Sequence, residues 1–468
     1  MTFNWMEEVL NRKEEILKET QAFLQIKSVL DEEKASEGAP FGPGIKEALE
    51  FMLQKGEQDG FTAKNLDGYA GHLEFGDGPD LLGILCHVDV VPEGDGWTTD
   101  PFSADIRDGK IYARGAIDDK GPTMAAYFAM KLVKEMNVPL KKRVRMILGT
   151  DEESDWRCMD HYFKHEEMPA FGFAPDADFP IIFAEKGIAD IELITKGDAL
   201  ENSNNHLISF ESGRRFNMVP DDAQVILHLE NPEEVKEKFE AFLQEQPVNG
   251  KATVEGHKLF LQIEGVSAHG SVPTSGKNAG LYSAKFLKGL KLDKQGEGFV
   301  DFLDHYLVDD GKGEKLGIQA EDDVSGELTV NVGLQHYRAE EGGKVGLNIR
   351  YPVKHQFETT KETLEAIAGK HNMKMNIVDN STPHHVPKDT EWLKTLQRVY
   401  EEQTGDKAEL ISIGGGTYAR VLENGVAFGP LFPGREEVAH QKDEYMWVED
   451  LLKATAIYAQ AIYELATE

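Results

Sequence analysis

The sequence predicts an α/β domain that is interrupted by an α+β insertion. Up to about residue 185 the chain repeats one pattern, a short apolar strand, a group of reactive polar residues and then a helix, which is typical of α/β domains. From about Lys186 to His384 strand-like stretches dominate, and the first pattern returns after Pro387. We therefore expect a discontinuous first domain (1–185 and 385–468) and an inserted second domain (186–384).

The first part of the chain should contain helices alternating with short strands. Apolar residues at helical spacing predict an amphipathic helix over Trp5–Ile26, and Pro43 marks the start of a second helix near Ile45–Gly56. A third helix is expected from Thr123 to about Met136. The expected strands are short runs between turn residues: Thr62–Leu66, Gly71–Phe75, Leu81–Cys86, Lys110–Arg114, Val144–Leu148 and Phe171–Ala174.

The same signals predict the rest of the chain. The expected strands of the insertion are Ile188–Thr195, Gln224–Leu229, Lys258–Glu264, Leu328–Val332 and Val345–Arg350, with helices at Asn278–Leu290 and Phe357–Ala368. After the insertion we expect helices at Thr390–Gln403 and Val448–Leu465 and a strand at Val426–Phe428.

Composition narrows the class of protein. A chain of 468 residues with 40% hydrophobic residues can build a substantial core, and a formal charge of −33 argues against binding nucleic acid. No apolar run is long enough to span a membrane, and the N-terminus lacks a signal-peptide pattern, so we expect a cytoplasmic protein. With only Cys86 and Cys158 as cysteines, any metal site should use histidines and carboxylates.

Residues that can bind metal follow several of the expected strands. His87 and Asp89 come directly after Leu81–Cys86, at the strand end where open α/β sheets place ligands. A carboxylate can hold one nitrogen of a histidine while the other nitrogen binds a metal. The full candidate set combines two imidazoles with carboxylates: His87, Asp118, Glu152, Glu153, Asp176 and His440. This set suits Zn²⁺, Mn²⁺ or Co²⁺, and it could hold two ions with a bridging carboxylate and leave one glutamate as general base.

Each candidate also has an ordinary structural explanation. Asp118–Asp119 could cap the helix that follows, and Glu152–Glu153 could be a solvated pair. His269 could be an ordinary loop histidine, and Arg350 could be a surface cation. Gly414–Gly416 lacks the Lys-Ser/Thr of a phosphate loop, so it indicates a close backbone approach near a substrate. The joint order of the residues, rather than any single one, favours a metal site.

Several motifs in this order resemble one known family. They are His87–Pro92, Arg114–Gly121, Gly149–Glu153, Pro175–Ala177, Ala268–Gly270, Gly414–Arg420 and His440. The sequence resembles the cocatalytic metallopeptidases, which include aminoacylases and glutamate carboxypeptidases, and most of all the PepV-type dipeptidases. The likeness covers essentially the whole chain. It implies a catalytic domain with a mixed central sheet flanked by helices, and an inserted α+β lid.

The resemblance also implies a role for each candidate in the catalytic domain. The implied metal ligands are His87 and Asp176 for one ion, Glu153 and His440 for the other, and Asp118 between them. The neighbouring Asp119 stays open as the bridge. Glu152 would be the general base, and Asp89 would hold His87.

The lid would carry the substrate contacts. By resemblance, His269 would stabilise the oxyanion, and Asn217 and Arg350 would contact the C-terminal half of the substrate. Gly415 would lie near the substrate as well. The lid is expected to move, because these residues must reach metals held by the other domain.

Three functions remain open on the sequence. The first is a dimetal dipeptidase that hydrolyses unblocked dipeptides with metal-activated water, and an aspartate at position 176 together with a long lid favours it. The second is an N-acyl amino acid deacylase on the same scaffold, and the third is a non-catalytic metal-binding relic. We expect small dipeptide substrates, no nucleic-acid or membrane partner, and a monomer, because a PepV-like lid replaces the partner subunit of smaller relatives.

Overall fold

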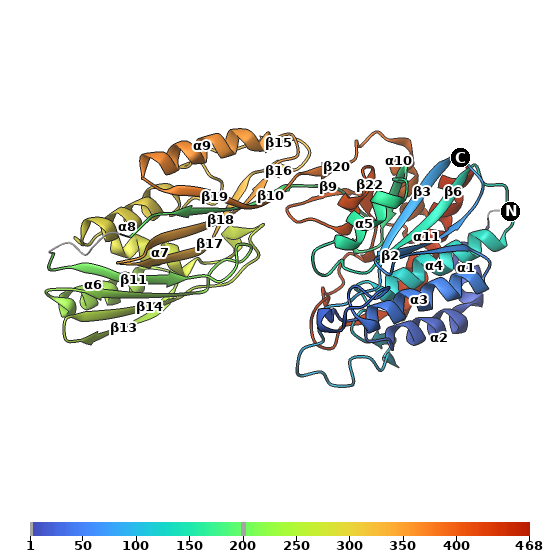
Figure 1. The fold of residues 1–468 in the computed structure, drawn as a ribbon, viewed down its shortest axis with the longest axis horizontal. Helices are drawn as coiled ribbons and strands as arrows, with labels where there is room; N and C mark the ends of the chain where they lie inside the picture. The colour runs from blue at the N-terminus through green and yellow to red at the C-terminus, as the bar shows by residue number, and fades with distance from the viewer. Residues whose placement is uncertain (1–2, 198–202) are drawn as a thin grey trace. The chain divides into compact units, whose positions relative to one another are not determined.

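The chain forms two compact units in the computed structural model, which describes residues 3–197 and 203–468 (Figure 1). The first unit comprises Met1–Ala184, His385–Ile411 and Gly416–Glu468, and the second comprises Glu185–His384 and Ser412–Gly415. Met1 and Thr2, the first residues of the N-terminal stretch considered above, lie outside the described residues.

A nine-stranded mixed sheet forms the centre of the first unit. Its order is β1-β2-β6-β3-β7-β22-β9-β20, with β21 paired to β9. The strands are β1 (Thr62–Leu66), β2 (Ala70–Phe75), β3 (Asp80–His87), β6 (Lys142–Gly149), β7 (Phe171–Ala174), β9 (Ile181–Glu185), β20 (His384–His385), β21 (Leu410–Ile413) and β22 (Gly425–Ala427). The pairs β3–β6, β3–β7 and β7–β22 are parallel, whereas β1–β2, β2–β6 and β9–β22 are antiparallel. The predicted mixed central sheet is confirmed.

Helices flank this sheet (Figure 1). They are α1 (Trp5–Asn11), α2 (Lys13–Leu24), α3 (Pro43–Gln58), α4 (Lys120–Glu135), α5 (Arg157–His165), α10 (Glu391–Thr404) and α11 (Val448–Thr467). Helices α4 and α11 pack against each other and bury most of their residues, which agrees with their apolar sequences. The single helix predicted over Trp5–Ile26 is wrong, because the backbone leaves the helical region at Arg12 (φ −106°, ψ 6°). Both halves still bury apolar residues, so the spacing alone could not reveal the break.

Short strands complete the first unit. The strands β4 (Asp105–Arg107), β5 (Lys110–Tyr112) and β24 (Tyr445–Trp447) form a three-stranded sheet. Strand β8 (Ala177–Asp178) pairs with β23 (Pro430–Leu431). The strand predicted over Lys110–Arg114 therefore ends two residues early, at Tyr112.

The second unit is an eight-stranded antiparallel sheet with helices. Its order is β13-β14-β12-β11-β17-β18-β10-β19. The strands are β10 (Gly187–Ile194), β11 (His206–Ser212), β12 (Asp222–His228), β13 (Asn249–Glu255), β14 (Lys258–Glu264), β17 (Thr329–Arg338), β18 (Gly342–Tyr351) and β19 (Lys374–Ser381), and the helices are α6 (Pro232–Glu245), α7 (Ala279–Leu287), α8 (Lys294–Tyr306) and α9 (Phe357–Lys370). Residues of β10 alternate between buried and half-buried, as in a sheet with one face covered by helices. The predicted α+β character of the insertion is confirmed, although α6 and α8 were not predicted.

Within residues 3–197 and 203–468, every helix is too short or too polar to cross a bilayer.

Candidate metal centre

Three parallel strands bring predicted ligands to one edge of the first unit's sheet. Strand β3 ends at His87, β6 ends at Gly149 and β7 ends at Ala174, and β3 pairs in parallel with both of the others. His87 lies opposite Gly149 in this register. The residues that follow β6 and β7, Glu152–Glu153 and Asp176, therefore lie beside His87.

The Asp118 carboxylate lies between the two predicted imidazoles. Its Oδ1 is 3.0 Å from His87 Nε2, and its Oδ2 is 2.9 Å from His440 Nε2. A Glu153 oxygen lies 3.1 Å from His440 Nε2, and Asp176 Oδ1 lies 3.8 Å from His87 Nε2. Three groups have ligand atoms within 4.8 Å of one another: His87, Asp118 and Asp176; His87, Glu152 and Glu153; Asp118, Glu153 and His440. All six candidates thus belong to one cluster.

The neighbouring Asp119 has a different environment. Its Oδ2 accepts hydrogen bonds from the His87 backbone N–H and from Thr123 Oγ1, both at 3.1 Å. Asp119 also stands directly before α4. Its carboxylate therefore supports the backbone beside the cluster, whereas the Asp118 carboxylate faces both imidazoles.

Asp89 connects two of the candidate ligands. His87 Nδ1, the ring nitrogen not directed at Asp118, is 3.0 Å from the Asp89 carbonyl oxygen and 3.4 Å from Asp89 Oδ1. Asp89 Oδ2 accepts a hydrogen bond from the Glu153 backbone N–H at 3.0 Å. The Asp89 backbone carbonyl thus orients the His87 ring, and its buried carboxylate holds the loop that carries Glu153.

The electrostatics of the cluster fit a bound cation. Burial and the charge of Asp118 raise the pKa of Asp176 to about 6 and that of Glu153 to about 7. Burial also raises the pKa of Glu152 well above its usual range. Hydrogen bonds to Asp118 and Glu153 raise the pKa of His440 to about 11. A divalent ion would offset the repulsion among these buried carboxylates and would favour neutral imidazoles, so the residues present fit the metals expected from the sequence.

The predicted lid residues lie in the second unit. The segments around Asn217 and His269 run side by side, since the Gly270 N–H donates to the Asn217 carbonyl at 2.7 Å. His269 is exposed, and its Nδ1 is 2.7 Å from Ser271 Oγ. Arg350 is buried, and its Nη1 donates to the Gly414 carbonyl at 3.0 Å, next to the predicted Gly415.

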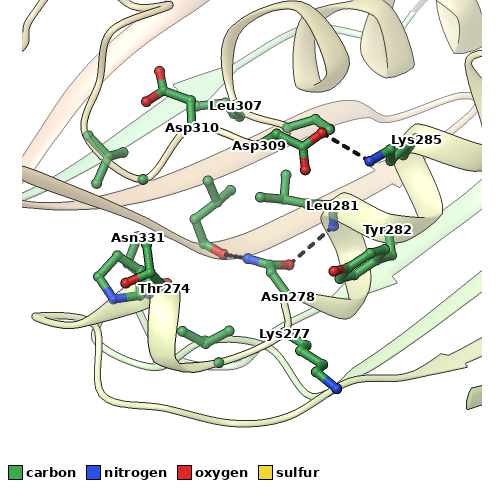
Figure 2. Close-up of a pocket in the computed structure, with 17 residues that line it drawn as sticks. Thr274, Lys277, Asn278, Leu281, Tyr282, Lys285, Leu307, Asp309, Asp310 and Asn331 are labelled. Atoms are coloured by element: carbon green, nitrogen blue, oxygen red, sulfur yellow. Dashed lines mark hydrogen bonds and ion pairs between the residues drawn. The ribbon is translucent and has the colours of Figure 1, made fainter. Parts of the chain in front are cut away.

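A separate cavity of about 380 Å³ opens in the same unit (Figure 2). Apolar side chains such as Val219, Leu281, Val308 and Val332 and polar ones such as Asn278 line it together. None of the predicted lid residues lines it. The cavity therefore does not coincide with the residues expected to contact substrate.

Residues that hold the Glu152–Glu153 loop were missed in the sequence. The buried Asp151 carboxylate accepts hydrogen bonds from the backbone N, Nε and Nη2 of Arg157 at 3.0, 2.8 and 2.9 Å. Trp156 Nε1 donates to the Glu152 carbonyl at 2.7 Å. An arginine six residues after Asp151 was the available signal that this carboxylate points inward.

Known proteins resemble this chain over nearly its full length. A protein of Bacillus subtilis (strain 168) named "Putative dipeptidase YtjP" is 54% identical over 464 residues, which cover 99% of this chain and 100% of the relative. A Staphylococcus epidermidis protein named "Putative dipeptidase" is 46% identical over 468 residues, which cover 99% of this chain and 100% of the relative. The crystal structure of aminoacylhistidine dipeptidase from Vibrio alginolyticus has the same fold, with a TM-score of 0.60, 13% identity and 97% of each chain covered.

A family model covers most of the chain as well. The model described as Peptidase family M20/M25/M40 matches residues 83–464, a range that includes every candidate metal ligand. The expected metallopeptidase resemblance and the expected peptide hydrolase are confirmed at this level. On these matches and on its fold, the chain belongs to Peptidase family M20/M25/M40.

Proposed function

We propose that this protein is a dimetal dipeptidase that hydrolyses unblocked dipeptides. The observation that carries the proposal is the Asp118 carboxylate between His87 and His440, with further carboxylates on both sides. This arrangement matches the need of a two-metal site for one bridging carboxylate and terminal ligands on each side. The names of the two bacterial relatives support the dipeptide as substrate.

The proposed ligands divide into two sets. His87 and Asp176 would bind the first ion, Glu153 and His440 the second, and Asp118 both. Zn²⁺, Mn²⁺ and Co²⁺ all accept such nitrogen and oxygen ligands. When bound, the ions would polarise the scissile carbonyl and make water acidic enough to react near neutral pH.

Glu152 is the proposed general base. It belongs to the cluster through His87 and Glu153, and it is the one glutamate of the set not required as a ligand. Burial raises the pKa of its carboxyl, and a higher pKa makes a carboxylate a stronger proton acceptor. Glu152 would take a proton from the attacking water and deliver it to the leaving amine. Asp89 would keep His87 in the required orientation.

The second unit is proposed to act as the lid. His269 would donate a hydrogen bond to the oxyanion of the tetrahedral intermediate. Arg350 and Asn217 would bind the free carboxylate of the dipeptide, for which a planar guanidinium is well suited. Gly415, beside the glycine whose carbonyl accepts from Arg350, would let the substrate approach the backbone closely.

A monomer in the cytoplasm is the proposed state of the protein. Cys86 and Cys158 are both buried and unpaired, which agrees with a reducing compartment. The long inserted unit supports a monomer, as argued from the sequence, and sedimentation would test that state directly.

Turnover by metal-stripped protein tests the proposed function. The protein is treated with a chelator and then titrated separately with Zn²⁺, Mn²⁺ and Co²⁺. The substrates are Leu-Leu, Leu-Leu-Leu and N-acetyl-leucine. Metal-restored cleavage of Leu-Leu alone supports the dipeptidase. Cleavage of N-acetyl-leucine alone would replace it with a deacylase, and no cleavage with any of the ions would contradict the proposal.

A further inference from the structure

A buried ion pair outside the ligand set lies beside two of the proposed ligands. Arg114 Nη1 is 2.5 Å from Glu444 Oε2, and the two side chains are 1% and 0% exposed. The pairing of β5 with β24 brings them together, because Arg114 follows β5 closely and Glu444 directly precedes β24. The Ala113 N–H also donates to the Glu444 carbonyl at 3.1 Å. Two charges completely removed from water require compensation in the form of specific hydrogen bonds.

The other carboxylate oxygen of Glu444 binds the backbone of the proposed bridging residue, Asp118. Its Oε1 accepts hydrogen bonds from the N–H groups of Ile117 at 2.9 Å and Asp118 at 3.3 Å. These bonds hold the turn before α4 from which the Asp118 side chain projects towards both imidazoles.

Arg114 holds the loop that carries His440. Its Nη2 donates to the carbonyls of His440 and Glu93, and its Nη1 donates to the carbonyl of Gln441, all at 3.3 Å. His440 has a φ of 62°, a left-handed backbone conformation that costs free energy for any residue with a Cβ. The guanidinium bonds to the carbonyls of His440 and Gln441 therefore help to hold the loop in this conformation.

We propose that Arg114 and Glu444 are a positioning pair for one of the two metals, the ion held by Asp118, Glu153 and His440. The inference rests on the proposed function, because it assigns a task within the same site. The pair binds the backbone at Asp118 and at His440, whereas His87 and Asp176 follow the ends of β3 and β7 and are held by the sheet. Asp118 is shared by both ions, whereas His440 is a proposed ligand of the second ion alone. Loss of the pair should therefore weaken the second site more than the first.

Stepwise metal binding tests this proposal. Zn²⁺ is titrated calorimetrically into chelator-stripped wild-type protein and into the variants Arg114→Lys and Glu444→Gln. Arg114→Lys keeps the charge but cannot span three carbonyls, and Glu444→Gln keeps an acceptor for the two N–H groups but loses the ion pair. We expect one of the two sites to lose roughly 10–100-fold in affinity, the range typical of groups that orient ligands. The other site, which shares only Asp118 with it, should lose clearly less.

A matched control separates positioning from general stability. Glu74→Gln removes one of the acidic partners of Arg145, whose Nε lies 2.6 Å from Glu74 Oε2 in the same unit. This variant should keep both Zn²⁺ affinities, even where its melting temperature falls. If Glu444→Gln does not fold, the Zn²⁺ affinities of Arg114→Lys alone test the positioning role.

The outcomes are distinguishable. Equal weakening of both sites, or unchanged affinities with only a lower melting temperature, would overturn the positioning role. A wild-type protein that binds no Zn²⁺, Mn²⁺ or Co²⁺ would instead overturn the proposed function itself.

Discussion

The metal cluster and the proposed lid residues are built in opposite ways. The cluster's His87 is fully buried at the end of a central strand, and Glu152, Glu153 and Asp176 follow parallel strands of the same sheet. His269 and Asn217 are exposed and lie on segments held mainly by backbone hydrogen bonds to each other. A cluster anchored at the end of a central sheet can be preorganised for ions before substrate arrives, whereas exposed loops can adjust when substrate binds. The difference predicts that substitutions in the two regions will affect different measurable quantities.

The largest effect is expected for Glu152→Gln. Removal of the general base should lower kcat by about 10²–10⁴-fold while leaving two metals bound, because Glu152 is proposed to move protons and not to bind the ions. Metal content by mass spectrometry and turnover of Leu-Leu measure the two properties. The adjacent Glu153→Gln is the matched control and should lose metal affinity. Full turnover by Glu152→Gln would remove the proposed base.

His269→Asn should come next and should change only catalysis. Loss of an oxyanion donor typically lowers kcat by about 10²–10³-fold. Zn²⁺ affinity should stay unchanged, because every residue of the metal cluster belongs to the first unit. Ser271→Ala, which removes the hydroxyl beside His269 Nδ1 but leaves the Ser271 backbone N–H there, should have a smaller effect. A His269→Asn protein that loses its metals would contradict the separation of tasks.

Two buried histidines of the first unit, His72 and His87, have pKa values shifted in opposite directions. His72 on β2 accepts a hydrogen bond from Tyr162 Oη at 2.9 Å, and burial together with the charge of Arg145 lowers its pKa to about 4. His87 is buried as well, but the carboxylates of Asp118 and Asp176 outweigh burial and raise its pKa well above the usual value. Burial alone therefore does not decide the charge of a histidine here; the neighbouring charges do.

The free energy of unfolding should decrease as pH falls below about 6.5, because His72 resists protonation in the native state. Between about pH 6.5 and pH 4 the unfolded chain binds a proton at this histidine and the native state does not, so the free energy of unfolding decreases as pH falls. The contribution is fully present above pH 6.5 and amounts to about 3 kcal/mol at most. Urea unfolding at pH 7 and pH 4.5 should show a weaker pH dependence for His72→Gln than for wild type. Identical pH dependences would show that His72 does not titrate in this way.

Residues close in sequence were easier to predict than residues brought together by the fold. His87 and Asp89 follow a recognisable apolar strand, so their place at the sheet edge could be expected. The choice between Asp118 and Asp119 depends on backbone geometry, because adjacent side chains diverge. Arg114 and Glu444 are 330 residues apart, and no local pattern indicates that two charged residues this distant are buried against each other. Helices α6 and α8 were missed because their many acidic and polar residues obscure the apolar stripe.

The smallest effect is expected for Asn331→Ala in the second unit. The Asn331 amide is buried and donates to the carbonyls of Phe216 and Met218 at 2.7 and 2.9 Å, which fixes the two residues that flank Asn217. Without these bonds the Asn217 segment must be ordered by the substrate, which should raise KM about tenfold, equivalent to ~1.4 kcal/mol, and change kcat little.

A half-buried amide of the same unit provides the control for Asn331. Asn278 Nδ2 donates to the Val332 carbonyl at 2.8 Å, and its Oδ1 caps α7 (Figure 2). Asn278→Ala should therefore lower the melting temperature without raising KM, because its bonds do not reach the Asn217 segment. Steady-state kinetics with Leu-Leu would compare the two variants. An equal rise in KM for both variants would mean that any loss of stability in the second unit weakens substrate binding. The exposed loops that carry Asn217 and His269 would then depend on the core of that unit, contrary to the contrast drawn with the metal cluster.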